Sequence, residues 1–258
     1  MTDHAANSRR SDPLADAPDG ALAAPAWFAG RARALGVEFE SGEIERLGRY
    51  LALLLHASEV MNLTAIREPE AAWEKHILDA LSLMPLLAEL ADGATVIDVG
   101  SGGGVPGIPV AIVQRRLKIV LVEATQKKAA FLESCAARLG LGNVQVLAER
   151  AEVAAHGPLR ESADLVMARA VGRLATLVEL SLPLAPVGGR VALIKGAAAQ
   201  EEIAEAQVAI RTLGGGPAQT IQTPTGRIVV IEKARPTPRT YPRRSGEPKR
   251  APIGAGKR

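Results

Sequence analysis

Residues 95–109 read TVIDVGSGGGVPGIP, an apolar run followed by a cluster of glycines. The run has the length and the β-branched content of a buried strand, and a helix is predicted directly after the glycines. In a doubly wound sheet, ligands lie at the carboxyl ends of the strands, and glycines there let the backbone approach a ligand without a Cβ in the way. The loop at residues 98–104 is therefore predicted to hold a nucleotide-like cofactor.

Beyond this loop, short apolar runs alternate with helical stretches. We expect strands at 95–99, 119–123, 144–147, 165–168 and 190–195, and helices near 108–115, 126–139, 174–184 and 201–213. Continuous apolar strands separated by helices indicate a parallel sheet covered on both faces. A last pair of strands, 219–222 and 227–232, is joined by Pro224-Thr225-Gly226, which is a hairpin signal. The pattern predicts an α/β fold of Rossmann-like type, with a mostly parallel seven-stranded sheet and an antiparallel C-terminal hairpin.

The segments outside the sheet differ in composition. Residues 25–92 carry apolar side chains at helical spacing and predict an N-terminal helical cap, which together with a core at 93–234 forms one domain. Residues 1–24 are rich in Ala, Asp, Pro and Ser and are predicted to be a disordered extension. Residues 235–258 form a basic, proline-rich tail that we expect to be extended and to take no part in a core.

Positive charge is concentrated in this tail. The chain has a formal net charge of +3, but the eight Lys and Arg residues after position 234, set against the single acid Glu247, contribute +7. The rest of the chain therefore carries −4, and the basic tail is a candidate electrostatic contact for nucleic acid.

Several classes of protein are disfavoured. Cys135 is the only cysteine of the chain, which rules out an internal disulfide, and the four histidines lie far apart with no ligand spacing, so no metal is expected. No apolar run resembles a signal peptide or approaches the ~20 residues of a membrane span. We expect a cytoplasmic protein, a monomer, that makes no contact with membranes.

The acidic residues around the loop narrow the choice of cofactor. Glu123 closes the second strand, 19 residues after Gly104, where a carboxylate can accept hydrogen bonds from both hydroxyls of a ribose. The spacing Gly102-x-Gly104-x-x-Gly107 also fits a dinucleotide, so an oxidoreductase remains an alternative. Asp98 at the strand end would face the cationic methionine end of S-adenosylmethionine better than a pyrophosphate. With the C-terminal hairpin, this favours S-adenosylmethionine and the class I methyltransferase layout.

The residues after the fourth strand bear on the acceptor of the methyl group. They read Ala168-Arg169-Ala170-Val171, which is not the Asn/Asp-Pro-Pro-aromatic loop that is usual for methylation of exocyclic amines. Methylation at pyrimidine C5 needs a cysteine nucleophile, and Cys135 lies in the middle of a predicted helix. A ring nitrogen such as guanine N7 has an available lone pair, so alignment of donor and acceptor is sufficient.

The chain resembles the bacterial small-subunit ribosomal RNA guanine-N7 methyltransferases, also called glucose-inhibited division protein B. The matching segments are residues 62–67 (NLTAIR), 76–80 (HILDA), 98–109 (DVGSGGGVPGIP), 168–170 (ARA), 193–196 (LIKG) and 241–246 (YPRRSG). The resemblance covers about residue 44 to the C-terminus. It implies methylation of N7 of a guanine, position 527, in the decoding-region hairpin of 16S ribosomal RNA on the small ribosomal subunit. A cofactor-binding, RNA-associated assembly factor without turnover is the alternative.

The resemblance also implies roles for single residues. The residues of this chain that match the family's cofactor contacts are Gly100 and Val105 in the loop, Ala151 and Glu152 near the adenine, Glu123 at the ribose, and Arg169. We add Asp98 and Gly102 to this set from the loop itself.

The substrate side is predicted from residue type and position, and a structural role stays open for each residue. Arg169, His76, Asp79 and Asn62 are candidates near the reacting groups, and Lys195, Arg243 and Arg244 are candidates for RNA contact. Arg169 can equally be an ion-pair partner at a strand end, and His76 and Asp79 can pair with each other on one helix face. Asn62 can cap a turn, and Lys195 can be a solvated surface residue.

Overall fold

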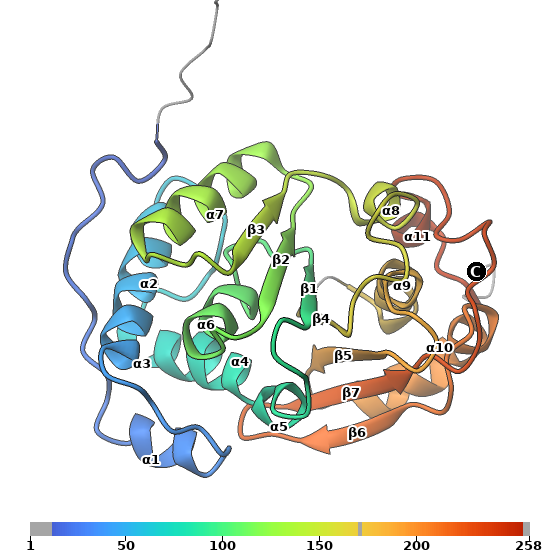
Figure 1. The fold of residues 1–258 in the computed structure, drawn as a ribbon, viewed down its shortest axis with the longest axis horizontal. Coiled ribbons are helices and arrows are strands. Elements are labelled where there is room, and N and C mark those ends of the chain that lie inside the picture. Colours follow the sequence, from blue (N-terminus) through green and yellow to red (C-terminus); the bar gives the residue numbers. More distant parts are fainter. Residues whose placement is uncertain (1–11, 170–171, 255–258) are drawn as a thin grey trace, which may run out of the picture.

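One seven-stranded sheet organises the chain (Figure 1). A computed structural model describes residues 12–169 and 172–254. The strands are β1 (Thr95–Val99), β2 (Lys118–Val122), β3 (Val144–Leu147), β4 (Leu165–Arg169), β5 (Arg190–Lys195), β6 (Gln219–Gln222) and β7 (Arg227–Glu232). Their order is β3-β2-β1-β4-β5-β7-β6. The expected fold class is confirmed, and each expected strand is present to within one residue at its ends.

The sheet changes direction once, at its C-terminal edge. β1 to β5 are parallel, whereas β7 runs antiparallel to β5, with Ala192 opposite Val230, and pairs with β6. A Cβ at Gly226, in the turn of the hairpin, would come within 2.5 Å of the carbonyl oxygen of Lys195. Glycine at this turn therefore lets the hairpin lie close against the end of β5.

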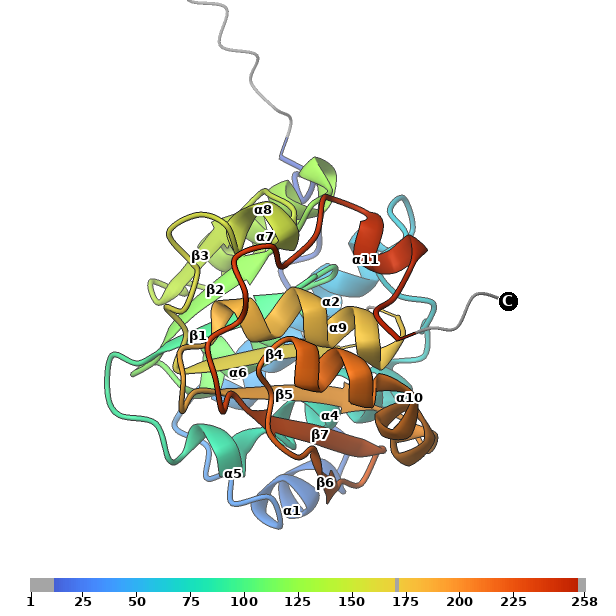
Figure 2. The same ribbon diagram turned by 90° about the vertical axis from the view of Figure 1, so that its right-hand side faces the viewer.

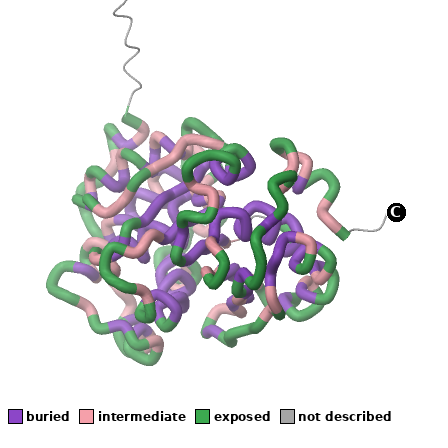
Figure 3. The backbone as a smooth tube through the Cα atoms, turned by 45° about the vertical axis from the view of Figure 1, so that its right-hand side comes forward, coloured by how far each residue is buried: buried purple, intermediate pink, exposed green. Residues whose placement is uncertain are grey.

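Alternating side chains of the strands build two apolar layers, one on each face. Val96 packs with the layer that includes α2 (Glu43–Ala57), α6 (Gly107–Val113) and α7 (Gln126–Arg138). Ile97 packs with the layer of α8 (Ala151–Ala154), α9 (Leu174–Ser181), η2 (Leu182–Leu184) and α10 (Ala199–Thr212). Figure 2 shows α9 and α10 in front of the sheet and α2 and α6 behind it. The central strands β1, β2, β4 and β5 are buried between the layers over most of their length, which is why they are mainly apolar, whereas β6 at the edge is exposed. Figure 3 shows the buried backbone at the centre of the molecule.

The predicted helical cap is present, and its part over residues 69–87 is one helical run with a π-helical middle, interrupted by a turn at Ser82–Leu83. After α1 (Phe28–Arg33) and α2 come α3 (Pro69–Ala72), the π-helical turn η1 (Trp73–Leu78), α4 (Asp79–Leu81) and α5 (Met84–Leu87). The Ser82 hydroxyl donates to the carbonyl oxygen of Leu78, and Pro85 lacks an amide proton, so neither residue favours a continuous helix here. The ring of Trp73 packs 4.5 Å from that of Phe28 between centroids, which joins α1 to η1.

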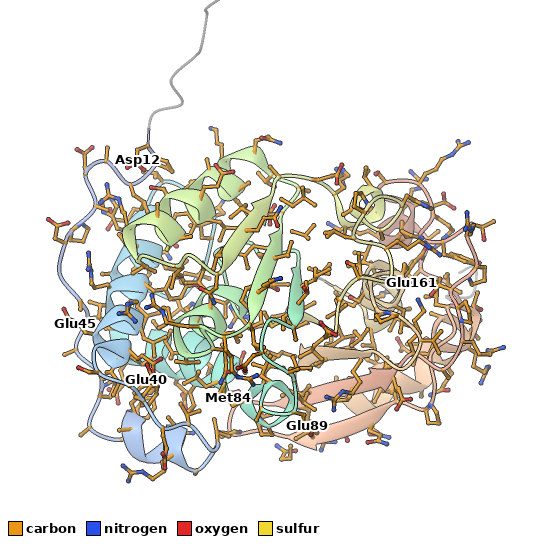
Figure 4. All side chains as sticks on the ribbon, in the orientation of Figure 1. Asp12, Glu40, Glu45, Met84, Glu89 and Glu161 are labelled. Carbon is orange, nitrogen blue, oxygen red and sulfur yellow. The ribbon has the colours of Figure 1, made fainter. Side chains whose placement is uncertain are left out.

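The prediction of a disordered extension is wrong for residues 12–24. Leu14 is fully buried, and the amide of Leu22 donates to the carbonyl oxygen of Gly48 at 3.1 Å. The carboxylate of Asp12, which Figure 4 labels, accepts hydrogen bonds from Ser134 and Arg138 on α7, a pairing given by their distances. A segment rich in Ala, Asp and Pro is thus held by a few anchoring contacts that its composition does not reveal. Residues 1–11 lie outside the described residues.

The prediction for the tail is also wrong over residues 235–254. Thr237 and Pro248 are buried, and the short helix α11 (Glu247–Arg250) packs against α9. The Arg160 guanidinium donates to the carbonyl oxygens of Tyr241 and Thr237, which fastens the segment that Figure 2 shows crossing α9. The tail is ordered because partners in the body satisfy its backbone groups and some of its charges. Residues 255–258 lie outside the described residues.

Candidate active site

A cavity of about 500 Å³ lies at the carboxyl ends of β1, β2 and β4. The chain leaves β1 toward β2 on one side and, later, continues from β4 to β5 on the other, so β1 and β4 flank the point at which the strand order reverses. In open α/β sheets, ligands bind at this point. The wall is formed by the glycine loop, the residue after β2, the start of α8, the end of β4, the cap and α11.

The glycine loop adopts a backbone that other residues rarely tolerate. Gly102 has a φ of 55° and Gly104 a φ of 93°, both in the left-handed region. The phenol of Tyr50, on α2, donates to the carbonyl oxygen of Gly103 at 2.8 Å. The cap therefore fixes the loop from behind. The predicted loop residues Gly100, Gly102 and Val105 all line the cavity.

Asp98 does not lie where the sequence predicted. Its side chain is 1% exposed, is not part of the cavity wall, and accepts a hydrogen bond from the amide of Gly107 at 3.1 Å. The carboxylate thus ties β1 to the start of α6 and does not form part of the cavity wall. Its Oδ1 has no partner among the described residues, and burial raises the pKa of this carboxyl to about 7.

A replacement of Asp98 by asparagine should change how stability depends on pH. An unfolded chain releases this proton near pH 3.8, whereas the folded protein keeps it to about pH 7, so the carboxyl favours the folded state less as the pH rises through that window. The amide of an asparagine side chain does not titrate and has no such loss. We expect the stability of Asp98→Asn, relative to the unmodified protein, to rise by about 2–3 kcal/mol from pH 5 to pH 8 in urea unfolding. Parallel pH profiles would contradict this.

Glu123 reaches the cavity directly after β2, as predicted. Its Oε2 accepts from the amide of Gly102 at 2.9 Å, and its Oε1 accepts from the amide of Thr125 at 2.7 Å. A carboxylate has about four acceptor positions, so two remain for hydroxyl groups of a ligand. The two backbone bonds hold the carboxylate still, which reduces the entropy lost on binding.

The start of α8 forms the next part of the wall. Ala151 and Glu152 both line the cavity, as predicted, but the carboxylate of Glu152 is occupied by the tail and accepts from the amide of Gly246 at 2.7 Å. Gly246 and Lys249 themselves line the cavity. Sequence reasoning missed the place of these two residues in the wall; the matching segment 241–246 was a signal for Gly246, and there was none for Lys249.

A polar network closes the end of the cavity that faces the cap. Arg169, at the end of β4, donates to the carbonyl oxygen of Lys75 at 2.5 Å and pairs with Asp79 at 3.4 Å. Its Nη2 lies 3.2 Å from Nδ1 of His76. Burial, with the nearby charge of Arg169, lowers the pKa of His76 to about 4. His76 and Asp79 are therefore joined through Arg169, and of the alternatives left open by the sequence, direct pairing with each other is wrong.

The same residues separate the cavity from a second, outer hollow of about 450 Å³. His76 and Arg169 line both spaces, and Asp79, Thr225 and Lys195 line only the outer one. Asp79 accepts a hydrogen bond from the hydroxyl of Thr225, in the hairpin turn. The wall between the two spaces, here called the partition, is thus built from four segments that are distant in sequence: residues 76–79, 169, 195 and 225.

Of the other predicted substrate residues, Lys195 and Arg243 are held in ion pairs. The ammonium of Lys195 pairs with Glu202 at 2.8 Å and donates to the carbonyl oxygen of Gly172 at 2.9 Å, which contradicts the reading as a solvated lysine. Arg243 is held by the fully buried Glu179, with Nη2–Oε2 at 2.6 Å. Asn62 is exposed and lies outside the walls of both spaces, whereas Arg244 is exposed as an RNA contact requires.

Comparison with known proteins identifies the family. The family model described as "rRNA small subunit methyltransferase G" matches residues 43–227, which is most of the chain. The chain belongs to this family. It is 50% identical over 223 residues to the ribosomal RNA small subunit methyltransferase G of Sorangium cellulosum, covering 86% of this chain and 93% of the relative. The Dehalococcoides mccartyi (strain CBDB1) member is 40% identical over 227 residues, covering 85% and 96%.

Solved structures support the fold. A protein of Corynebacterium glutamicum superposes with a TM-score of 0.51 at 16% identity, covering 82% of this chain and 98% of that one. At this identity the likeness concerns the fold alone. The family match and the cavity at the strand ends, in contrast, bear on the site, because the matched residues 43–227 contain the glycine loop, Glu123 and the cap network.

Neither a metal site nor a membrane span is found in the part of the chain that the structure describes. Residues 12–169 and 172–254 hold no group of three or more His, Cys, Asp or Glu side chains that could bind a metal ion. Among the helices of these residues, none has the length and apolar character needed to cross a membrane.

Proposed function

We propose that this protein transfers a methyl group from S-adenosylmethionine to N7 of a guanine in the decoding-region hairpin of 16S ribosomal RNA. The observation that carries the proposal is Glu123, a carboxylate with open acceptor positions, in a cavity at the strand-order reversal beside the glycine loop. Membership of the rRNA small subunit methyltransferase G family supports the choice of substrate.

The residues of the cavity fit the proposed cofactor. Glu123 would accept from the ribose hydroxyls, and the loop at Gly100, Gly102 and Val105 leaves space for the backbone to approach the ligand closely. Ala151 and Glu152 would lie beside the adenine. Bound S-adenosylmethionine would supply a methyl group already activated by its sulfonium charge.

The cap end of the cavity suits alignment rather than acid–base chemistry. His76 has a lowered pKa of about 4, so it is neutral at neutral pH, and its ring nitrogens are held by Arg169 and Thr64. A guanine N7 attacks through its own lone pair and has no proton to lose. We therefore assign Arg169 and His76 the task of shaping the wall against which donor and base are aligned, and Asp79 the task of holding Arg169 in place.

RNA contact is assigned by exposure and charge. Arg244 is exposed on the tail beside the cavity, and Lys249 lines the cavity mouth. Arg243 and Lys195 are held in ion pairs, so we propose that they position the tail and the partition, and that any RNA contact they make is secondary.

The test is methyl transfer to ribosomal RNA. Purified protein, labelled S-adenosylmethionine and small subunits that lack the modification should yield label in 16S RNA. Borohydride–aniline cleavage followed by primer extension should then place the N7 mark in the decoding-region hairpin. Cofactor binding in calorimetry without any transfer would favour an assembly factor without turnover, and binding of NAD in place of S-adenosylmethionine would favour an oxidoreductase.

A further inference from the structure

One hydroxyl of the cavity wall, that of Thr64, has its hydrogen-bonding direction fixed by its neighbours. Thr64 lies in the cap segment after α2 and lines the cavity. Its Oγ1 accepts from the amide of Ile66 at 3.1 Å and lies 2.9 Å from Nε2 of His76. Whether Thr64 donates to this imidazole or accepts from it depends on which ring nitrogen carries the proton.

Arg169 decides the tautomer of His76. Its Nη2 lies 3.2 Å from Nδ1, and a guanidinium can only donate, so Nδ1 must accept and cannot carry a proton. The lowered pKa of His76 keeps the ring neutral, which places its single proton on Nε2. The imidazole therefore donates to Thr64.

It follows that Thr64 can only donate. A hydroxyl oxygen has two acceptor positions and one proton. Ile66 and His76 fill both acceptor positions, and no other acceptor for the proton lies within hydrogen-bonding distance among the described residues. Since the side chain is part of the cavity wall, the O–H is available to an acceptor inside the cavity.

We propose that the Thr64 hydroxyl donates to O6 of the target guanine and so selects guanine while holding N7 toward the methyl donor. The major-groove edge of guanine carries two acceptors, N7 and O6. N7 is the reacting atom, which leaves O6 for a donor in the wall. Adenine presents an amino group at the same place, and Thr64 has no acceptor position left for it. This inference rests on the proposed function.

Base analogues in the RNA test the contact atom by atom. We would compare subunits or RNA carrying guanine, 2-aminopurine or 2,6-diaminopurine at the target position. The first analogue keeps N7 but lacks O6, and the second replaces O6 by an amino group. For the unmodified protein we expect kcat/KM for methyl transfer to fall about 10-fold with 2-aminopurine and about 100-fold with 2,6-diaminopurine, where two donors face each other.

Two variants of Thr64 separate the hydroxyl from the shape of the side chain. Thr64→Val keeps the shape and removes the O–H, so its rate with guanine should fall about 10-fold and become equal to its rate with 2-aminopurine. Thr64→Ser keeps the O–H and should keep the preference for guanine. Thr176→Val is a matched control in the same wall, because the Thr176 hydroxyl already donates to the carbonyl oxygen of Pro248 at 3.0 Å. It should leave the preference unchanged.

The outcomes are distinct. A Thr64→Val protein that binds S-adenosylmethionine normally in calorimetry and has lost its preference for guanine over 2-aminopurine supports the assignment. An unchanged preference overturns it, and so does a loss of cofactor affinity in Thr64→Val, since the hydroxyl would then serve the cofactor. If the unmodified protein transfers no methyl group to guanine, the proposed function fails first, and that result is seen before any variant is made.

Discussion

Alanine in place of Glu123 is expected to weaken binding of S-adenosylmethionine by at least about 100-fold, which is the loss of two hydrogen bonds to a charged acceptor at about 1.5–3 kcal/mol each. The carboxylate also fixes the glycine loop, since its Oε2 accepts from the amide of Gly102 at 2.9 Å. Its removal therefore takes away both the ribose acceptor and the support of the loop. Titration calorimetry with S-adenosylmethionine and with S-adenosylhomocysteine measures the effect.

The matched variant is Glu123→Gln, which has the same shape but a single acceptor oxygen. Because both carboxylate oxygens already accept from backbone amides, glutamine can retain only part of the arrangement, and we expect an intermediate loss of about 10-fold. Thermal melting without ligand is the control. If the melting transition of Glu123→Ala collapses, Glu123 is structural, and if cofactor affinity is unchanged, the ribose assignment is wrong.

Alanine in place of Arg243 is expected to lower the free energy of unfolding by about 3 kcal/mol, because it leaves a buried carboxylate without its counter-ion. Glu179 is fully buried, and its two oxygens accept from Nε, Nη2 and the backbone amide of Arg243 at 2.6–2.9 Å. The same change should free α11 and the segment before it from the body. Urea unfolding measures the stability, and limited proteolysis reports release of the tail.

Arg244 provides the control, since it has the same charge one residue later and is exposed. Arg244→Ala should change stability by no more than about 0.5 kcal/mol, as is usual at the surface. If it contacts phosphate, RNA binding should weaken and the salt dependence of binding should become shallower by about one charge. If Arg243→Ala melts like the unmodified protein while binding RNA less well, the roles given to the two arginines must be exchanged.

The sequence predicted the structure correctly wherever the conformation of a segment depends on its own residues. The strand and loop at residues 95–104 and the acid Glu123 after β2 were placed correctly, because apolar strands, glycine turns and the edge at which parallel strands end follow from short stretches. The hairpin at Pro224–Gly226 was likewise found from its turn residues.

The sequence predicted the structure incorrectly wherever a side chain finds its hydrogen-bond or ion-pair partner in a distant segment. Composition predicted a disordered extension and an extended tail, yet Asp12 is held by α7 and Arg243 by Glu179. Asp98 was placed facing the cofactor, because its position in the strand says nothing about the amide of Gly107 that holds it nine residues later. The sequence left open that Lys195 is a solvated surface residue, because it does not show that Glu202 lies within ion-pair distance of it.

The amino-acid sequence by itself thus determined the fold, the glycine loop, the position of Glu123 after β2 and the family. Only the tertiary structure decided what the loop's neighbours do: that Asp98 supports the loop from behind, that the tail forms part of the cavity wall, and that Arg169 sets the tautomer of His76 and so the donor at Thr64. The physical reason is that strand and turn preferences act over a few residues. The direction of a buried hydrogen bond is set by groups that folding brings together from far apart in the chain.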